Sequence, residues 1–344
     1  MIGISTFLSL IAAVLIFGIL IFVHEIGHFI AAKATHTGVN EFSIGMGPKI
    51  LYYQGKNTLY SLRAFPLGGF VRLKSLEENP DASDAFEQKN ALVRIVILIS
   101  GALMNVLFAL VISVIMTSTE PYLVKNVISD FHETNVSSSF GLKVGDEILE
   151  IDGKKIYSSS DIIYSLSYSG GEPVDVTIKR DGQTTTITDV SFVTFEEEGI
   201  KGYTPDFYLT AVNKTFLGVV KQGVFECYAA CRSVWDTFSM LFSGEIGMQA
   251  MSGPIGTTAA ISSAVSYGMR SALYITMLLG VNLGIVNLFP LPVLDGGKIL
   301  ITLIEAIIRR KINPKIENAI TLISIALLLF IMIFVSFNDV MRFK

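Results

Sequence analysis

The hydrophobic positions of the chain gather into four stretches that are each long enough to cross a lipid bilayer. A transmembrane helix needs about 20 predominantly apolar residues. The four stretches cover residues 4–32, 95–116, 272–289 and 319–337. From residue 121 the composition becomes that of a soluble domain before the third stretch begins. The pattern predicts a polytopic α-helical membrane protein with four transmembrane helices and a domain inserted between the second and third helices.

The connection after the first stretch has the alternating pattern of β-strands. Strand-like runs flank a turn at residues 54–57, and a second hairpin is predicted with its turn at 66–69 and its return strand at 70–73. An exposed sheet edge can bind a peptide substrate in an extended conformation by strand pairing. On this hypothesis Gly68, Gly69 and Phe70 contact the substrate. The alternative is a small sheet that only plugs the helices.

The inserted segment is predicted to fold as a small α/β domain over residues 121–200. Its Gly141-Leu142-Lys143-Val144-Gly145-Asp146 turn leads into a strand that ends at the Asp152-Gly153 hairpin turn. A short helix at 161–167 and an alternating strand at 174–182 follow. This order resembles a PDZ domain, a fold that binds extended peptides by strand addition. We expect a PDZ-like domain that either binds a peptide or has only a structural role.

Residues 201–270 are predicted to form an amphipathic segment, with a helix at 216–242. Charged residues interrupt its apolar positions, which suits a helix lying in the membrane interface. A solvated helix is the competing interpretation. Cys227 and Cys231 lie four residues apart on this helix, and as the only two cysteines they exclude a disulfide framework. Packing is their expected role.

Charge distribution predicts the sidedness of the chain. The connection at 33–94 and the connection between the third and fourth stretches are rich in lysine and arginine, so both are expected in the cytoplasm. The inserted domain and both termini are then extracytoplasmic, in a multi-pass protein of the inner (cytoplasmic) membrane. The first stretch lacks the basic N-terminal region and the small-residue cleavage site of a signal peptide, so we expect it to remain in the protein as a transmembrane helix. The net charge of -4, without a basic block, excludes nucleic acid as a partner.

The first hydrophobic stretch contains the motif His24-Glu25-Ile26-Gly27-His28. Residues four apart share one face of a helix, so His24 and His28 can bind one zinc ion. Glu25 can then hold and deprotonate the water that the metal activates. Ionisable side chains at membrane depth are costly, which favours a functional interpretation over a chance pentapeptide.

A catalytic zinc ion usually takes three ligands from the protein. Asp295 is the sole carboxylate at the end of the third stretch, where Pro290 and Pro292 forbid a regular helix. Non-helical backbone at membrane depth is tolerated only beside a cavity. The sequence therefore predicts that Asp295 completes the metal site.

His24-Glu25-x-x-His28 together with Asn287-x-x-Pro290-x-Pro292-x-Leu294-Asp295-Gly296 resembles the site-2 protease family of intramembrane zinc metalloproteases. The single PDZ-like insert is similar to the bacterial RseP-like branch, although its best-known members carry two such units. The resemblance implies that His24, His28 and Asp295 bind Zn²⁺ and that Glu25 is the general base. It also implies that Asn282 and Asn287 engage the substrate backbone or orient the site.

These inferences predict four segments: a first half of the protease core (1–120), the PDZ-like domain (121–200), the amphipathic segment (201–270) and a second half of the core (271–344). The predicted function is a zinc-dependent endopeptidase that cleaves transmembrane segments of single-span proteins within the lipid bilayer. The resemblance implies anti-sigma factors or remnant signal peptides as substrates. One alternative function is a non-catalytic, membrane-anchored adaptor that binds peptides through its PDZ-like domain, but such a protein needs no metal site. A second alternative is a zinc transporter, which would not explain the presence of Glu25.

Overall fold

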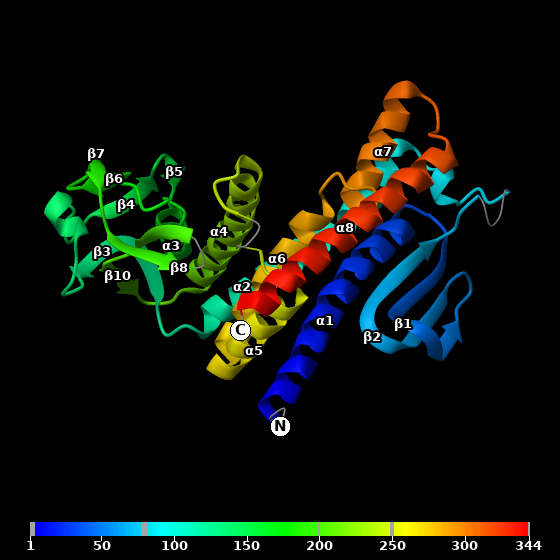
Figure 1. The fold of residues 1–344 in the computed structure, drawn as a ribbon, viewed down its shortest axis with the longest axis horizontal. Coiled ribbons are helices and arrows are strands. Elements are labelled where there is room, and N and C mark those ends of the chain that lie inside the picture. Colours follow the sequence, from blue (N-terminus) through cyan, green and yellow to red (C-terminus); the bar gives the residue numbers. More distant parts are fainter. Residues whose placement is uncertain (1–3, 77–80, 198–199, 248–250, 343–344) are drawn as a thin grey trace. The chain divides into compact units, whose positions relative to one another are not determined.

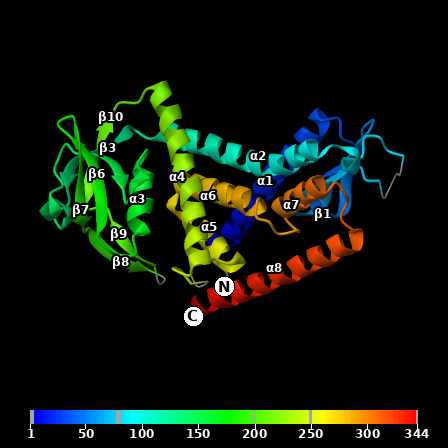
Figure 2. The same ribbon diagram turned by 90° about the horizontal axis from the view of Figure 1, so that it is seen from above.

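The computed structural model describes residues 4–76, 81–197, 200–247 and 251–342 and divides into two compact units (Figures 1 and 2). The helical unit comprises residues 1–109 and 252–344, and the inserted unit comprises residues 110–251. The helices are α1 (Ile4–Ala34), α2 (Ala91–Thr119), α3 (Ser159–Ser167), α4 (Phe216–Ser243), α5 (Pro254–Tyr267), α6 (Met269–Asn287), α7 (Asp295–Ile308) and α8 (Pro314–Arg342). The strands are β1 (Val39–Gln54), β2 (Leu59–Leu73), β3 (Leu123–Phe131), β4 (Glu147–Ile151), β5 (Lys154–Lys155), β6 (Val174–Arg180), β7 (Gln183–Val190), β8 (Val193–Glu197), β9 (Ile200–Thr204) and β10 (Phe207–Val212).

Four helices among the described residues are long and apolar enough to cross a membrane. They cover Leu10–Ala34, Ala91–Thr119, Met269–Asn287 and Lys315–Met341, in α1, α2, α6 and α8. These ranges overlap all four stretches predicted from the hydrophobic pattern. The prediction of four span-length helices is therefore confirmed.

Strands β1 and β2 form a folded sheet against α1 (Figure 1). Residues 41–44 of β1 lie between two segments of β2, because Phe42 pairs with Val71 on one side and with Tyr60 on the other. The predicted second hairpin is therefore wrong. Residues 69–73 pair with the start of β1 and not with the strand just before them, since residues 39–44 supply hydrogen-bond partners to both segments.

A buried carboxylate holds this folded sheet together. Glu41 is only 2% exposed, and it accepts hydrogen bonds from Arg63 at 2.8 Å and Ser61 at 2.7 Å, with Lys49 at 3.6 Å. Burial alone would raise the pKa of Glu41, but the hydrogen bonds and positive charges of these neighbours lower it below its ordinary value. Glu41 is therefore ionised at neutral pH, and its contacts with Arg63 and with Arg72 at 3.9 Å tie both segments of β2 to β1.

The third span ends where the prolines predict. Helix α6 stops at Asn287, and α7 begins at Asp295 after a non-helical connection. Gly296 and Gly297 allow the connection to fold back closely, since a Cβ atom at these positions would collide with the backbone of Leu288 and Leu291 respectively. This close packing fixes the first turn of α7, which carries Asp295.

Helix α5 begins at a buried carboxylate supplied by α8. Asp339 is 1% exposed, and it accepts hydrogen bonds from the backbone N–H groups of Gly253 at 3.2 Å and Gly256 at 2.8 Å. A carboxylate at this position satisfies free N–H groups of the first helical turn and their partial positive charge. The sequence pattern did not predict α5 as a separate helix.

The inserted unit contains a sheet with strand order β10-β3-β4-β6-β7, in which β5 pairs with β4. Its core consists of buried aliphatic and aromatic side chains from the sheet and α3, including Ile148, Leu166 and Phe207. Ser158 and Asp161 form a capping box at the start of α3. Strand β10 joins the sheet through β3, so this fold continues beyond residue 200, where the sequence placed a boundary.

Helix α4 confirms the helix predicted at 216–242, and its charged side chains contact the α/β fold of its own unit. Arg232 forms an ion pair with the buried Asp161 at 2.7 Å, and Asp236 forms one with Lys154 at 2.6 Å. In Figure 2, α3 lies between the sheet and α4. Helix α4 also exposes large apolar side chains such as Trp235, which is 62% exposed.

Candidate metal centre

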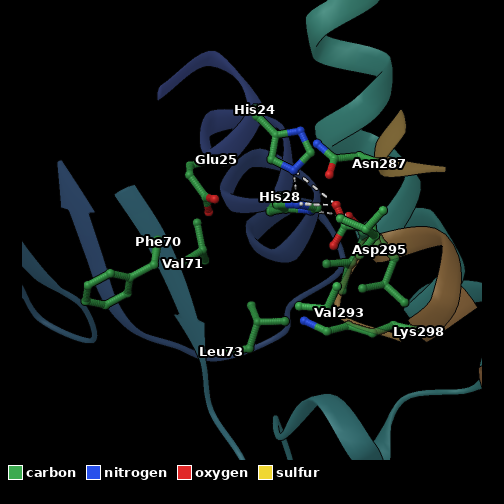
Figure 3. Close-up of a pocket in the computed structure, with 13 residues that line it drawn as sticks. His24, Glu25, His28, Phe70, Val71, Leu73, Asn287, Val293, Asp295 and Lys298 are labelled. Carbon is green, nitrogen blue, oxygen red and sulfur yellow. Dashed lines mark hydrogen bonds and ion pairs between the residues drawn. The ribbon is translucent and has the colours of Figure 1, made fainter. Parts of the chain in front are cut away.

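Three predicted ligands meet in the helical unit. His24 and His28 lie one turn apart on α1, and Asp295 is the first residue of α7. The Nε2 atoms of the two histidines are 3.1 Å apart, and Oδ2 of Asp295 is 3.0 Å from Nε2 of His24 and 3.1 Å from Nε2 of His28 (Figure 3). The three atoms thus form a nearly equilateral triangle.

This donor set fits zinc. Two imidazole nitrogens and one carboxylate oxygen are the ligand types of catalytic zinc sites, which leave a fourth position open. A tetrahedral zinc ion with bonds of about 2.0–2.2 Å separates its ligand atoms by about 3.3 Å. The observed spacing is slightly smaller, so small side-chain movements would admit the ion. Of the described residues, only His24, His28 and Asp295 form such a group of three.

Small residues let α1 and α2 approach closely at this site. A Cβ atom on Gly101 would lie 2.5 Å from Nε2 of His28 and 2.7 Å from Cε1 of His24. A Cβ atom on Gly27 would collide with the carbonyl of Ser100. Both glycines are therefore required by the helix crossing, and Gly101 leaves room for the two imidazole rings.

Glu25 lines the same pocket as the three candidate ligands, a cavity of about 310 Å³. Its carboxylate accepts a hydrogen bond from the backbone N–H of Val71 in β2. Figure 3 shows Glu25 between α1 and this strand. The pocket therefore combines a three-ligand group with a carboxylate that is not one of the ligands.

Some of the other predicted site residues line the pocket, and others lie outside it. Phe70 and Asn287 line the pocket. Gly69 lies beside Glu25, since a Cβ atom there would be 3.5 Å from the Cγ of Glu25. Gly68 lies next to Met46 and has a φ of +96°, which favours glycine. Asn282 does not line the pocket, and its buried Oδ1 has no hydrogen-bond partner in the part of the chain that the structure describes.

Sequence reasoning missed three contributions to this site. Nδ1 of His28 is 2.8 Å from the backbone carbonyl of Ile97 in α2. The N–H of Val71 is another backbone group, and backbone contacts between distant segments leave no signal in residue types. Lys298 lines the pocket one turn after Asp295. The sequence could have predicted this position, because residues three apart on a helix, such as Asp295 and Lys298, are neighbours on its surface.

The arrangement is suited to metal-assisted hydrolysis. The triangle of His24, His28 and Asp295 could hold a zinc ion, the Glu25 carboxylate could accept a proton, and the strand segment at 69–73 carries backbone groups along one wall of the pocket. Among the described residues, the pairing of this segment is with β1 on one side only, and its other side faces Glu25.

Comparisons with known proteins agree with this chemistry. The sequence matches Peptidase family M50 over residues 12–331. It is 26% identical to the zinc metalloprotease RasP of Geobacillus kaustophilus over 424 aligned residues, covering 99% of each chain. It is 33% identical, over 333 residues, to a protein of Clostridium perfringens that carries a zinc metalloprotease name, covering 96% of this chain and 98% of the relative. The matched region includes His24, Glu25, His28 and the start of α7, and the chain belongs to peptidase family M50, the site-2 protease family of zinc metalloproteases.

Proposed function

We propose that this membrane zinc metalloprotease is an endopeptidase that cleaves transmembrane segments of single-span membrane proteins. The observation that carries the proposal is the position of the site on α1. His24, Glu25 and His28 lie within a helix of span length, in which no charged residue precedes Glu25. Catalytic groups at that depth are costly unless they act on a substrate at the same depth.

The proposed chemistry uses three ligands and one base. His24, His28 and Asp295 would hold the zinc ion, which would supply polarisation of the peptide carbonyl and a lowered pKa of the attacking water. Glu25 accepts that proton and donates it to the leaving amine. The N–H of Val71 holds the Glu25 carboxylate against the wall of the pocket.

A transmembrane substrate arrives as a helix, and its peptide bonds are inaccessible until it unwinds. Unpaired backbone groups in hydrocarbon cost several kcal/mol each. The segment at 69–73 is an edge strand facing the pocket, so an extended substrate can pair with it. The amide of Asn287, which also lines the pocket, is suited to bind one further backbone group of the substrate.

The proposal includes an orientation and a role for the inserted unit. Lys33 ends α1 shortly after His28, and the basic connections at 33–94 and 309–315 favour the cytoplasmic side. The site is then near the cytoplasmic face of the inner membrane, and the inserted unit is outside. The turn at Asp152-Gly153 and the order of strands around α3 support a PDZ-like fold, in which β10 is the strand available to a peptide.

The test is co-expression of the full-length protein with a panel of tagged single-span membrane proteins. We expect at least one to be cut within its transmembrane segment, and Glu25→Gln to reduce that cleavage by about 100-fold or more. A peptide-binding adaptor would instead capture tagged proteins equally well in both forms without cutting them. Cleavage that is unchanged in Glu25→Gln would contradict the assignment of the base.

A further inference from the structure

Helix α2 presents two hydrogen-bonding groups to the two histidines of α1. The carbonyl of Ile97 is 2.8 Å from Nδ1 of His28, and the amide of Asn105 is 3.5 Å from Nδ1 of His24. Ile97, Gly101 and Asn105 are spaced by four residues, so they share one face of α2. The histidines are also spaced by four, and the two helices run in opposite directions at this crossing.

A histidine that binds a metal through Nε2 carries its hydrogen on Nδ1, and that N–H needs an acceptor. For His28 the acceptor is the carbonyl of Ile97. For His24 the neighbouring polar group is the amide of Asn105, whose side chain is fully buried. Each histidine ring therefore has a polar group of α2 beside its Nδ1 atom.

The amide of Asn105 has an unused acceptor. Its Nδ2 faces Nδ1 of His24, while its Oδ1 is buried and has no hydrogen-bond partner among the described residues. Rotation of the amide by 180° exchanges the two atoms and directs Oδ1 to His24. An Nδ1–H group on His24 favours that orientation, because two N–H donors facing each other cannot form a hydrogen bond.

We propose that Asn105 is the positioning residue for His24: its Oδ1 accepts the Nδ1–H of His24 and thereby directs Nε2 of His24 to the zinc ion. The inference rests on the proposed ligand set of His24, His28 and Asp295. It assigns to α2 a role in zinc affinity that is separate from its role as a membrane span. Groups that orient metal-binding histidines typically contribute about 10- to 100-fold in metal affinity.

The amide of Asn287 is the competing candidate, since Asn287 and His24 line the same pocket (Figure 3). Asn287 lines the pocket, whereas Asn105 is buried behind the ring. The side-chain amide within hydrogen-bonding distance of Nδ1 of His24 belongs to Asn105. Comparison of the two asparagines therefore separates positioning of the ligand from contact with the substrate.

The experiment measures zinc affinity by chelator competition on purified full-length protein, together with the thermal unfolding midpoint of the metal-free form. We expect Asn105→Leu to weaken zinc binding by about 10- to 100-fold without lowering the metal-free midpoint. Asn105→Asp retains an acceptor, so it should restore zinc affinity to within about threefold of the parent protein. Asn287→Leu should leave zinc affinity unchanged.

The possible results separate the inference from the ligand set on which it rests. The role of Asn105 would be overturned if Asn105→Leu and Asn105→Asp lost equal zinc affinity, or if only Asn287→Leu lost it. In both cases the ligand set would still stand as long as His24→Ala abolishes zinc binding. If His24→Ala binds zinc as tightly as the parent protein, the ligand set itself is wrong. If Asn105→Leu does not fold, Asn105→Ala, which also lacks an acceptor, replaces it in the same comparison.

Discussion

The backbone N–H of Val71 donates a hydrogen bond to the carboxylate of Glu25. The proposed base is therefore held by an edge strand and not by another side chain. Val71 pairs with Phe42 through the opposite edge of the strand. An N–H that points away from a sheet can be removed by proline without loss of a ladder hydrogen bond.

We expect Val71→Pro to lower the turnover number by about 10- to 100-fold, because a hydrogen bond to a charged group contributes about 1.5–3 kcal/mol. Zinc content should remain at one ion per chain. Val71→Ala keeps the N–H and is the matched control, so it should retain most of the activity. Equal activity of the proline and alanine variants would show that Glu25 does not depend on this hydrogen bond.

Removal of single ligands should separate binding of the metal from catalysis. His24→Ala and Asp295→Ala each leave two protein ligands for zinc, so we expect both variants to lose the metal during dialysis. Glu25→Gln should keep about one zinc ion per chain but lose activity, because Glu25 is not in the ligand triangle. Elemental analysis of the purified variants measures this directly. Full zinc occupancy in Asp295→Ala would exclude Asp295 as a ligand.

Gly101→Ala should weaken zinc binding, because the new methyl group would lie 2.5 Å from Nε2 of His28. Overpacking of this kind costs about 1–3 kcal/mol, equivalent to about 5- to 150-fold in affinity if the histidines absorb the strain. Gly280→Ala is the control, since the nearest side-chain atom to its methyl group would be Cδ2 of Leu20 at 3.3 Å. Chelator competition on both variants gives the comparison, and similar zinc affinities would contradict the prediction.

The β1–β2 sheet should lose stability in acid. The pKa of Glu41 is lowered in the folded protein, so its contribution to stability is complete above the unfolded-state pKa of about 4.3. That contribution is lost as the pH falls through the lower, folded-state pKa. At pH 6 we expect proteolytic cutting within residues 45–65 to be faster in Glu41→Gln than in the parent protein. The difference should shrink below about pH 4, and a constant difference from pH 6 to pH 3 would contradict the prediction.

Thiol labelling tests the proposed orientation. After replacement of Cys227 and Cys231 by serine, single cysteines are introduced at Lys56, Lys311 and Asp181. An impermeant reagent added outside intact cells should label the Asp181 position and spare the other two, because the basic connections are expected in the cytoplasm. Labelling in lysed cells shows that all three positions are reactive. The opposite pattern in intact cells would invert the orientation.

The sequence predicted the features of this protein that depend on local spacing. Four span-length helices follow from runs of apolar residues. The approach of His24 to His28 follows from helical periodicity, and the break before Asp295 follows from Pro290 and Pro292. The meeting of Asp295 with the two histidines could be inferred because few ionisable groups are available at that depth to complete a site.

The remaining features depend on contacts between distant segments. The strand at 69–73 pairs with β1 and not with its neighbour in sequence, and hydrophobic alternation does not specify which partner a strand takes. Asn105 and His24 are separated by 81 positions, and their contact depends on a helix crossing that Gly27 and Gly101 permit. Residue types alone do not specify which atom of α2 faces His24.

The carboxylate of Asp339 determines where the chain re-enters the helical unit after the long insertion. Gly253 and Gly256 are tied to α8, so the start of α5 is set by contacts within the helical unit. Replacement of the inserted unit by a short flexible linker should therefore leave the register of α5 and α6 unchanged. The insertion is in this sense an exchangeable module, and domains of different size can be accommodated at this point without a change in the metal centre.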